Sequence, residues 1–178
     1  RDIVWFVRAM TYYKRKPLIL KSPPHTGRVG VLAELFPGAK FIHITRNPET
    51  LFASTRRLWP TLDMAQGLQV PKNEHLDEYI FAAFERMYRG FESQRTGLAP
   101  NQIIDIRYED LVADTMGQVE HIYRELEIDG FETVRDRLQA FVGQRKDYKP
   151  NRHEDLSPEI RAEIQRRWSG YIEKYGYA

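Results

Sequence analysis

Apolar residues recur along this chain with two different spacings, and their alternation predicts the order of helices and strands. Spacings of three or four residues, typical of amphipathic helices, occupy residues 2–13, 26–36, 76–91, 119–126, 131–141 and 160–175. Short unbroken apolar runs, typical of buried strands, occupy residues 17–21, 40–45 and 103–108. The pattern therefore predicts three strands that are separated by helices.

The clearest helix start follows the second predicted strand. Asn47 is a favoured N-cap residue, Pro48 suits the first helical position, and Glu49 complements the helix dipole. We expect this helix to run to about Leu58. A long loop is expected over residues 59–76, because that stretch contains proline and glycine and shows no clear period.

Strands that alternate with helices imply crossover connections and a parallel sheet. We therefore expect one α/β domain over residues 1–178, with the parallel sheet between helical layers. Ligands bind beyond the carboxyl ends of the strands in such sheets. The three predicted strands end at Lys21, Arg46 and Tyr108, so the candidate chemistry is expected around these residues.

Composition narrows the choice of function. The 27 basic and 25 acidic residues give a net charge of +2, which argues against a nucleic-acid partner and makes any anion site local. The absence of cysteine excludes disulfides, cysteine-bound zinc and thiol catalysis. No apolar run approaches the roughly 20 residues of a membrane span. Together these features favour a cytoplasmic location, and no metal-ligand cluster is visible in the sequence.

Arg46 and Ser54 are the first candidate pair. Arg46 lies at a strand exit beside a helix N-terminus, where backbone N–H groups and the helix dipole favour an anion. Its guanidinium adds a forked, permanently charged donor suited to phosphate. Ser54 follows eight residues later, about two helical turns on. The local sequence equally allows a surface arginine and an incidental serine.

Lys21 and His25 are the second candidate pair. A lysine at the end of a strand can neutralise charge on a transferring group. A histidine can accept a proton from an acceptor hydroxyl near neutral pH. Taken singly, each residue is as readily explained by a structural role: Lys21 as a solvated side chain, His25 as a helix cap.

Two further features complete the candidates. Tyr108, at the exit of the third predicted strand, offers a ring on which a base can stack. The carboxylates of Glu109 and Asp110 that follow it suit a helix cap. Arg145 and Lys146 belong to a basic loop that either folds over an anion or is simply solvated.

Three separated motifs resemble the family of PAPS-dependent sulfotransferases, where PAPS is 3'-phosphoadenosine 5'-phosphosulfate. The motifs read LKSPPHTGR, ELFPGAKFIHITRNP and RYEDL. The resemblance covers nearly the whole chain and implies a three-layer α/β/α, P-loop NTPase-like fold. It also implies in-line transfer of a sulfuryl group to a hydroxyl or amine, with release of adenosine 3',5'-bisphosphate and without a metal.

The resemblance assigns four of the candidates to the 3'-phosphate of the donor and one to its adenine. The arginine-to-serine spacing of eight matches the family's 3'-phosphate site, so Arg46 and Ser54 are implied as its ligands. Arg145 and Lys146 match a basic loop that meets the same phosphate. Tyr108 matches a tyrosine near the adenine.

The resemblance also gives roles to the reacting end. Lys21 matches the lysine beside the bridging oxygen of the leaving group. His25 is an approximate match to the catalytic histidine, because its offset from the lysine differs from that of the cytosolic enzymes.

One part of the family pattern has no counterpart in this sequence. The family begins with a strand and a P-loop-like segment that holds the 5'-phosphosulfate. Gly27 and Gly30 do not replace that segment, because they lie inside a predicted helix. We therefore expect about a hundred further residues upstream, unpaired strand edges, possible self-association and little activity from these 178 residues alone.

Two other functions remain open from the sequence. One is a P-loop nucleotide or sugar kinase, and the other is a non-catalytic module that binds a nucleotide bisphosphate. The acceptor is expected to be a small molecule or a glycan. Residues 59–76 and 143–156 are candidates to border its pocket, as are Trp59 and Tyr79, although core packing explains these two aromatic residues as well.

Overall fold

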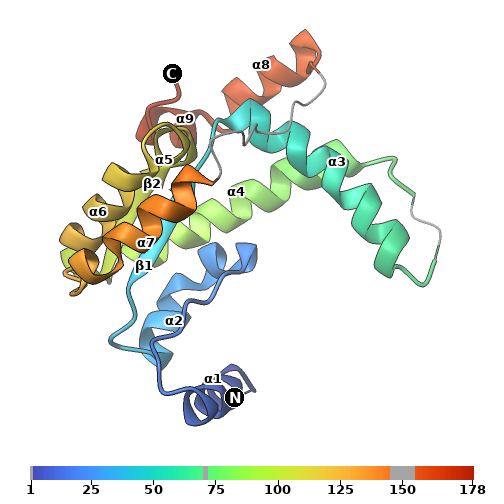
Figure 1. Ribbon diagram of the computed structural model, residues 1–178. Coiled ribbons are helices and arrows are strands. Elements are labelled where there is room, and N and C mark those ends of the chain that lie inside the picture. The colour runs from blue at the N-terminus through green and yellow to red at the C-terminus, as the bar shows by residue number, and fades with distance from the viewer. Residues whose placement is uncertain (1, 70–71, 145–154) are drawn as a thin grey trace.

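The computed structural model describes residues 2–69, 72–144 and 155–178 (Figure 1). Helices make up most of these residues, and the sheet has two strands. In chain order the elements are α1 (Asp2–Tyr13), the 3₁₀ helix η1 (Pro23–Arg28), α2 (Val29–Leu35), β1 (Phe41–Thr45), α3 (Pro48–Gln66), α4 (Leu76–Arg95), the 3₁₀ helix η2 (Pro100–Gln102), β2 (Ile103–Arg107), α5 (Tyr108–Ala113), α6 (Thr115–Glu125), α7 (Phe131–Gly143), α8 (Pro158–Arg167) and α9 (Ser169–Lys174).

The sheet pairs β1 with β2 in parallel. Phe41 lies opposite Ile103 and Thr45 lies opposite Arg107, so the two strands end at the same edge. This confirms the second and third predicted strands and the α/β class. Among the described helices, none combines the length and the apolar character that crossing a bilayer requires.

The first predicted strand, at residues 17–21, is wrong for this structure. The segment is irregular and pairs with no strand among the described residues. Ile19 within it is 96% exposed. A strand is stabilised by backbone hydrogen bonds to a neighbour, and β1 and β2 offer this segment none.

The predicted loop over residues 59–76 is also wrong in its first half. Helix α3 continues through Pro60 to Gln66, far beyond the expected end near Leu58. A proline inside a helix removes one backbone hydrogen bond and costs about 3 kcal/mol. Here the helix persists while Trp59 packs against the main core and meets Tyr79 edge-on, with 5.6 Å between ring centroids.

The main core lies between α3, α4, α8 and α9. Its centre is aromatic: the Phe84 and Trp168 rings stack with centroids 4.0 Å apart, and Phe52 is fully buried against both Phe81 and Trp168. The helix predicted over residues 160–175 is interrupted at Trp168, which ends α8 and precedes α9. This core holds the C-terminal residues against the edge of the sheet where the strands end.

A second, smaller core covers the opposite face of β2. Ile104 and Ile106 pack there against Ile122 and Leu126 of α6 and its C-terminus. On β1, Ile42 and Ile44 occupy the same face and are 47% and 49% exposed. Helices therefore cover both faces of β2 but only one face of β1.

Candidate functional site

The turn after β1 is held by a side chain from the far end of the sequence. The Tyr171 hydroxyl accepts a hydrogen bond from the Arg46 backbone N–H at 2.9 Å and donates one to the Arg46 carbonyl at 2.8 Å. Tyr171 is buried in the main core, only 6% exposed. Both polar backbone groups of Arg46 are thus bound to one immobilised hydroxyl.

The next residue of the turn is bound from the end of the neighbouring strand. Glu109, in the first turn of α5, accepts a hydrogen bond from the Asn47 backbone N–H at 2.9 Å. The Asn47 side chain accepts one from the Thr50 backbone N–H at 3.1 Å and so caps α3. This cap confirms the predicted start of α3. Glu109 was expected to cap its own helix, but it binds the turn after β1 instead.

The Arg46 side chain lies over a residue from the other strand exit. Its guanidinium carbon is 4.6 Å from the centroid of the Tyr108 ring. No carboxylate in the described parts of the chain forms an ion pair with this guanidinium. A cation stacked on an aromatic ring without an anionic partner is suited to bind an external anion.

Ser54 lies in the second turn of α3. The helical repeat puts it on the same side of α3 as Asn47 and Thr50, whereas Phe52 points into the core. Ser54 is partly exposed, and no hydrogen bond joins it to Arg46 in this structure. Its role as a phosphate ligand stays a prediction.

Lys21 and His25 lie on the irregular segment before α2 and on η1. Lys21 is exposed. His25 receives a hydrogen bond at its Nδ1 from Arg28 Nε at 3.3 Å. Partial burial, and then the charge of Arg28, lower the pKa of His25 below its ordinary value of 6.5. The imidazole is therefore neutral near pH 7.

Gln94 of α4 holds the turn that carries His25. Its side-chain amide donates to the Gly27 carbonyl at 3.1 Å and accepts from the Gly30 backbone N–H at 2.9 Å. A Cβ atom at Gly30 would come within 3.1–3.3 Å of that side chain, so a glycine permits the close approach. Both glycines pack against side chains of α4, Gly27 near Met87 and Gly30 near Gln94.

A partly buried polar network spans the two strands on the face of the main core. His43 Nδ1 lies 2.7 Å from Asp105 Oδ1, and His43 Nε2 lies 3.0 Å from the Tyr88 hydroxyl. Arg95 forms a two-pronged ion pair with Asp105, at 2.7 and 3.1 Å. Burial raises the pKa of Asp105, but the hydrogen bonds from His43 and Arg95 outweigh it and bring that pKa to about 2.

The remaining candidates are the other predicted phosphate ligands and possible metal ligands. Arg145 and Lys146, predicted to bind the 3'-phosphate, lie outside the described residues. Residues 2–69, 72–144 and 155–178 contain no group of three or more histidine, aspartate or glutamate side chains arranged to hold a metal ion.

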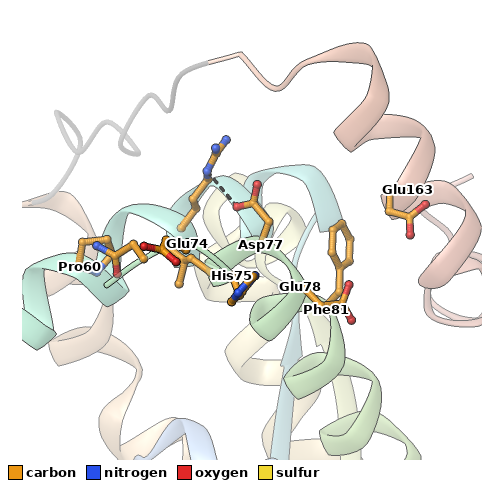
Figure 2. A pocket seen from close by; sticks show the side chains of 10 residues that line it. Pro60, Glu74, His75, Asp77, Glu78, Phe81 and Glu163 are labelled. Carbon is orange, nitrogen blue, oxygen red and sulfur yellow. Dashed lines mark ion pairs between the residues drawn. The ribbon is translucent and has the colours of Figure 1, made fainter. Parts of the chain in front are cut away.

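An open pocket of about 630 Å³ lies between α3, α4 and α8 (Figure 2). Arg56 and Asp77 form an ion pair at its wall, with 3.0 Å between Arg56 Nε and Asp77 Oδ1. The other lining residues come mainly from the end of the loop before α4, its first turns and α3: Pro60, Asn73, Glu74, His75, Leu76, Glu78, Phe81 and Glu163. None of the described donor-binding or catalytic candidates lines this pocket, but Pro60 and residues 73–76 belong to the stretch 59–76 that was predicted to border the acceptor pocket. The wall of the pocket is rich in carboxylates.

The structure thus brings together some predicted residues and adds others. Arg46 and Tyr108 meet at the strand exits, and Tyr171 and Glu109 fix the backbone beneath them. The available sequence signal for Tyr171 was the cluster of three tyrosines within residues 171–177. That cluster fits core packing equally well, so the hydroxyl contacts were missed.

Comparison with known proteins completes the description of the site. The sulfotransferase family model matches residues 4–133. The omega-hydroxy-beta-dihydromenaquinone-9 sulfotransferases Stf3 of Mycobacterium bovis and of Mycobacterium tuberculosis are each 37% identical to the chain over 177 residues, which is 99% of the chain. The chain spans 45% of the length of these relatives. No solved structure matches the chain with significance.

Proposed function

The chain belongs to the sulfotransferase family, and on that premise we propose that it uses PAPS as its donor and binds the donor's 3'-phosphate at Arg46. The reaction is transfer of the sulfuryl group to an acceptor hydroxyl, with release of adenosine 3',5'-bisphosphate. The S–O bond to the donor's phosphate breaks, the S–O bond to the acceptor forms, and the acceptor loses its proton.

The observation that carries this proposal is the state of the Arg46 side chain. Its backbone is held at the end of β1 by the Tyr171 hydroxyl. Its guanidinium lies 4.6 Å from the centroid of the Tyr108 ring, and the described residues supply no carboxylate to neutralise it. The N-terminus of α3 starts two residues later and adds the helix dipole. A dianionic phosphate fits this combination of a fork of donors, a positive helix end and an aromatic wall.

The remaining residues receive roles that match the family motifs. Ser54, on the Asn47 side of α3, supplies a hydroxyl to the same phosphate. Arg145 and Lys146 add charge to it from the segment before α8. Binding energy gained at a phosphate that does not react orients the end that does, so these residues contribute to the rate without touching the sulfuryl group.

Lys21 and His25 are proposed for the reacting end. Lys21, exposed beside η1, neutralises charge on the leaving phosphate. His25 accepts the proton of the acceptor hydroxyl. The Arg28 hydrogen bond occupies Nδ1, which leaves the neutral ring's proton on Nε2, and an Nε2–H group cannot act as a base. His25 therefore acts through Nδ1, after the Arg28 side chain has turned away from it.

A pH–rate profile tests this role of His25. Because its pKa is lowered, activity should be flat above pH 6.5 and should fall on the acid side, where the imidazole becomes protonated. His25→Ala should remove that acid limb and slow turnover by about 10²- to 10⁴-fold. A histidine variant that keeps the wild-type profile and rate would exclude His25 as the base.

The α/β fold is proposed to be the P-loop NTPase-like fold, completed by an upstream strand and its phosphosulfate-binding loop. The free edge of β1 supports this, because an added strand would pair there. The crossover helix that accompanies a parallel strand would cover the exposed Ile42 and Ile44. The greater length of the Stf3 relatives leaves room for such a strand.

The acceptor is proposed to be a hydroxyl group on a lipid-like molecule. The printed name of the Stf3 relatives identifies a hydroxylated menaquinone as theirs, and 37% identity over 99% of the chain supports an acceptor of the same chemical class. Apolar side chains on the second half of α3 are exposed, with Leu58 at 51% and Met64 at 72%. They offer an apolar surface on the helix that begins at the proposed donor site.

Titration of adenosine 3',5'-bisphosphate into the full-length natural protein tests the donor site. Arg46→Ala removes a charge-assisted contact and should weaken binding by about 1.5–3 kcal/mol, roughly 10- to 150-fold. Arg57→Ala, an exposed arginine on the same helix, is the control and should bind as the wild type does. Equal affinities for wild type and Arg46→Ala would remove the proposed anchor.

The same protein distinguishes the other two functions. A sulfotransferase should melt at a higher temperature with adenosine 3',5'-bisphosphate than with ATP and Mg²⁺, whereas a nucleotide or sugar kinase should show the reverse order. A non-catalytic module should bind the bisphosphate but transfer no sulfuryl group from PAPS to a hydroxylated lipid.

A further inference from the structure

Distant side chains bind three of the polar backbone groups in the turn that carries Arg46. Tyr171 binds the Arg46 N–H and carbonyl, and Glu109 binds the Asn47 N–H. Tyr171 lies 125 residues from Arg46 in the sequence. It also lies beyond residues 4–133, the part that the family model matches.

Tyr177 holds both of these side chains in place. Its hydroxyl donates a hydrogen bond to Glu109 Oε2 at 2.9 Å, and its ring stacks on that of Tyr171 with an 11° tilt between the planes. The same hydroxyl lies 3.1 Å from Thr45 Oγ1, at the last residue of β1. Arg107 adds its guanidinium over the Tyr177 ring, 4.5 Å from the centroid.

We propose that Tyr171 is a positioning residue for donor binding, which sets the direction of the Arg46 guanidinium by fixing the Arg46 backbone, with Tyr177 and Glu109 as its supports. The proposal rests on the proposed function, because it takes Arg46 as the ligand of the 3'-phosphate. Tyr171 itself touches no donor atom in this assignment. It acts only through Arg46.

The physical reason is that the guanidinium lies at the end of a long side chain, so its position depends strongly on the backbone conformation of the turn. Arginine has four rotatable side-chain bonds, so a small rotation of its peptide units moves the guanidinium by ångströms. When a binding group is displaced by about 1 Å, it loses a large part of its contribution to ligand binding. Fixing both backbone groups of Arg46 limits this motion before the donor binds. Less conformational entropy is therefore lost on binding.

Tyr175 provides a matched control within the same segment. It belongs to the same buried core as Tyr171, and the two are 9% and 6% exposed. Its hydroxyl donates to Glu92 at 2.6 Å and accepts from Arg95 at 3.1 Å, with no contact to the Arg46 turn. Loss of either hydroxyl removes two hydrogen bonds and preserves the ring.

The experiment compares Tyr171→Phe and Tyr175→Phe in the full-length natural protein. Affinity for adenosine 3',5'-bisphosphate is measured by calorimetric titration, and stability is measured by urea unfolding. We expect Tyr171→Phe to bind the bisphosphate about 5- to 20-fold more weakly than the wild type, as expected for one or two hydrogen bonds. Tyr175→Phe should lose comparable stability and retain wild-type affinity.

A double-variant cycle with Arg46→Ala tests whether Tyr171 acts through Arg46. In the Arg46→Ala background, Tyr171→Phe should change the affinity by less than about twofold, since the side chain that it positions is gone. Equal affinity loss for Tyr171→Phe and Tyr175→Phe, or additive losses in the cycle, would overturn the proposal. So would wild-type affinity in Tyr171→Phe.

The same measurements separate this inference from the proposed function. If the wild type fails to bind the bisphosphate, or Arg46→Ala binds as tightly as the wild type, the donor site is wrong and Tyr171 has nothing to position. If Arg46→Ala loses affinity and Tyr171→Phe does not, the donor site stands and only the positioning role of Tyr171 falls.

Discussion

The two strands of the sheet are alike in sequence but differ in how much of each is covered. Each has five residues, and on one shared face both carry isoleucine, Ile42 and Ile44 on β1 and Ile104 and Ile106 on β2. The β2 pair is at most 8% exposed under α6, whereas the β1 pair is 47% and 49% exposed. Burial on this face is therefore decided by the neighbouring helix and not by the strand.

On the other face of the sheet, β1 buries polar side chains instead of apolar ones. There the polar residues His43 and Thr45 are buried, at 7% and 1% exposed. Each is satisfied by hydrogen bonds, His43 with Asp105 and Tyr88, and Thr45 with Tyr177. Buried polar groups are stable when paired in this way. The most completely packed side of β1 is thus the side that anchors the C-terminal tyrosines.

The largest expected effect on stability comes from replacing one isoleucine of each strand with alanine and comparing the two variants. Ile106→Ala, under α6, should lower the free energy of unfolding by about 2–5 kcal/mol through lost burial and the cavity left behind. Ile44→Ala, its direct register partner, should cost about 1 kcal/mol or less. Urea unfolding of both variants measures the difference, and similar losses would mean that α6 does not distinguish the two strands.

The ion pair between Asp105 and Arg95 on this face predicts a loss of stability in acid. The pKa of Asp105 is held at about 2, below that of a free carboxyl near 3.8. A lowered pKa stabilises the folded state fully above pH 4, and this stabilisation is lost as the pH falls toward 2. Because solvent screens the partly exposed Asp105, the wild type should lose about 1 kcal/mol over this range through this group.

Asp105→Asn tests that assignment, with Asp129→Asn at an exposed carboxylate as the control. The Asp105 variant should unfold more readily at pH 7 and should show a flatter stability curve between pH 4 and pH 2. The control should keep the wild-type curve. Parallel curves for wild type and Asp105→Asn would contradict the prediction.

The smallest effect on stability is expected on the open face of β1. The double change Ile42→Lys and Ile44→Lys should alter the unfolding free energy of the 178-residue chain by about 1 kcal/mol or less, since both side chains are half exposed. It should reduce self-association, because charges on a strand with a free edge oppose pairing between chains. Sedimentation velocity of both forms measures association, and unchanged association would exclude this face as the contact.

The sequence predicted the local features of the site correctly. The Asn47 cap, Pro48 at the first helical position and Arg46 at the end of β1 follow from short-range preferences. The periodicity of residues 76–91 likewise predicted α4. The family resemblance read from three motifs is confirmed by the match to the sulfotransferase family.

Tertiary structure decided the features that depend on distant neighbours. An apolar run at residues 17–21 remained irregular because no described strand lies beside it, and α3 passed through Pro60 while Trp59 packs against the core. The hydroxyl of Tyr171 reached Arg46 across 125 residues. Caps and periodicities are settled within a few residues of the chain, whereas strand pairing, burial and the fixing of a binding side chain require that separate segments meet in space.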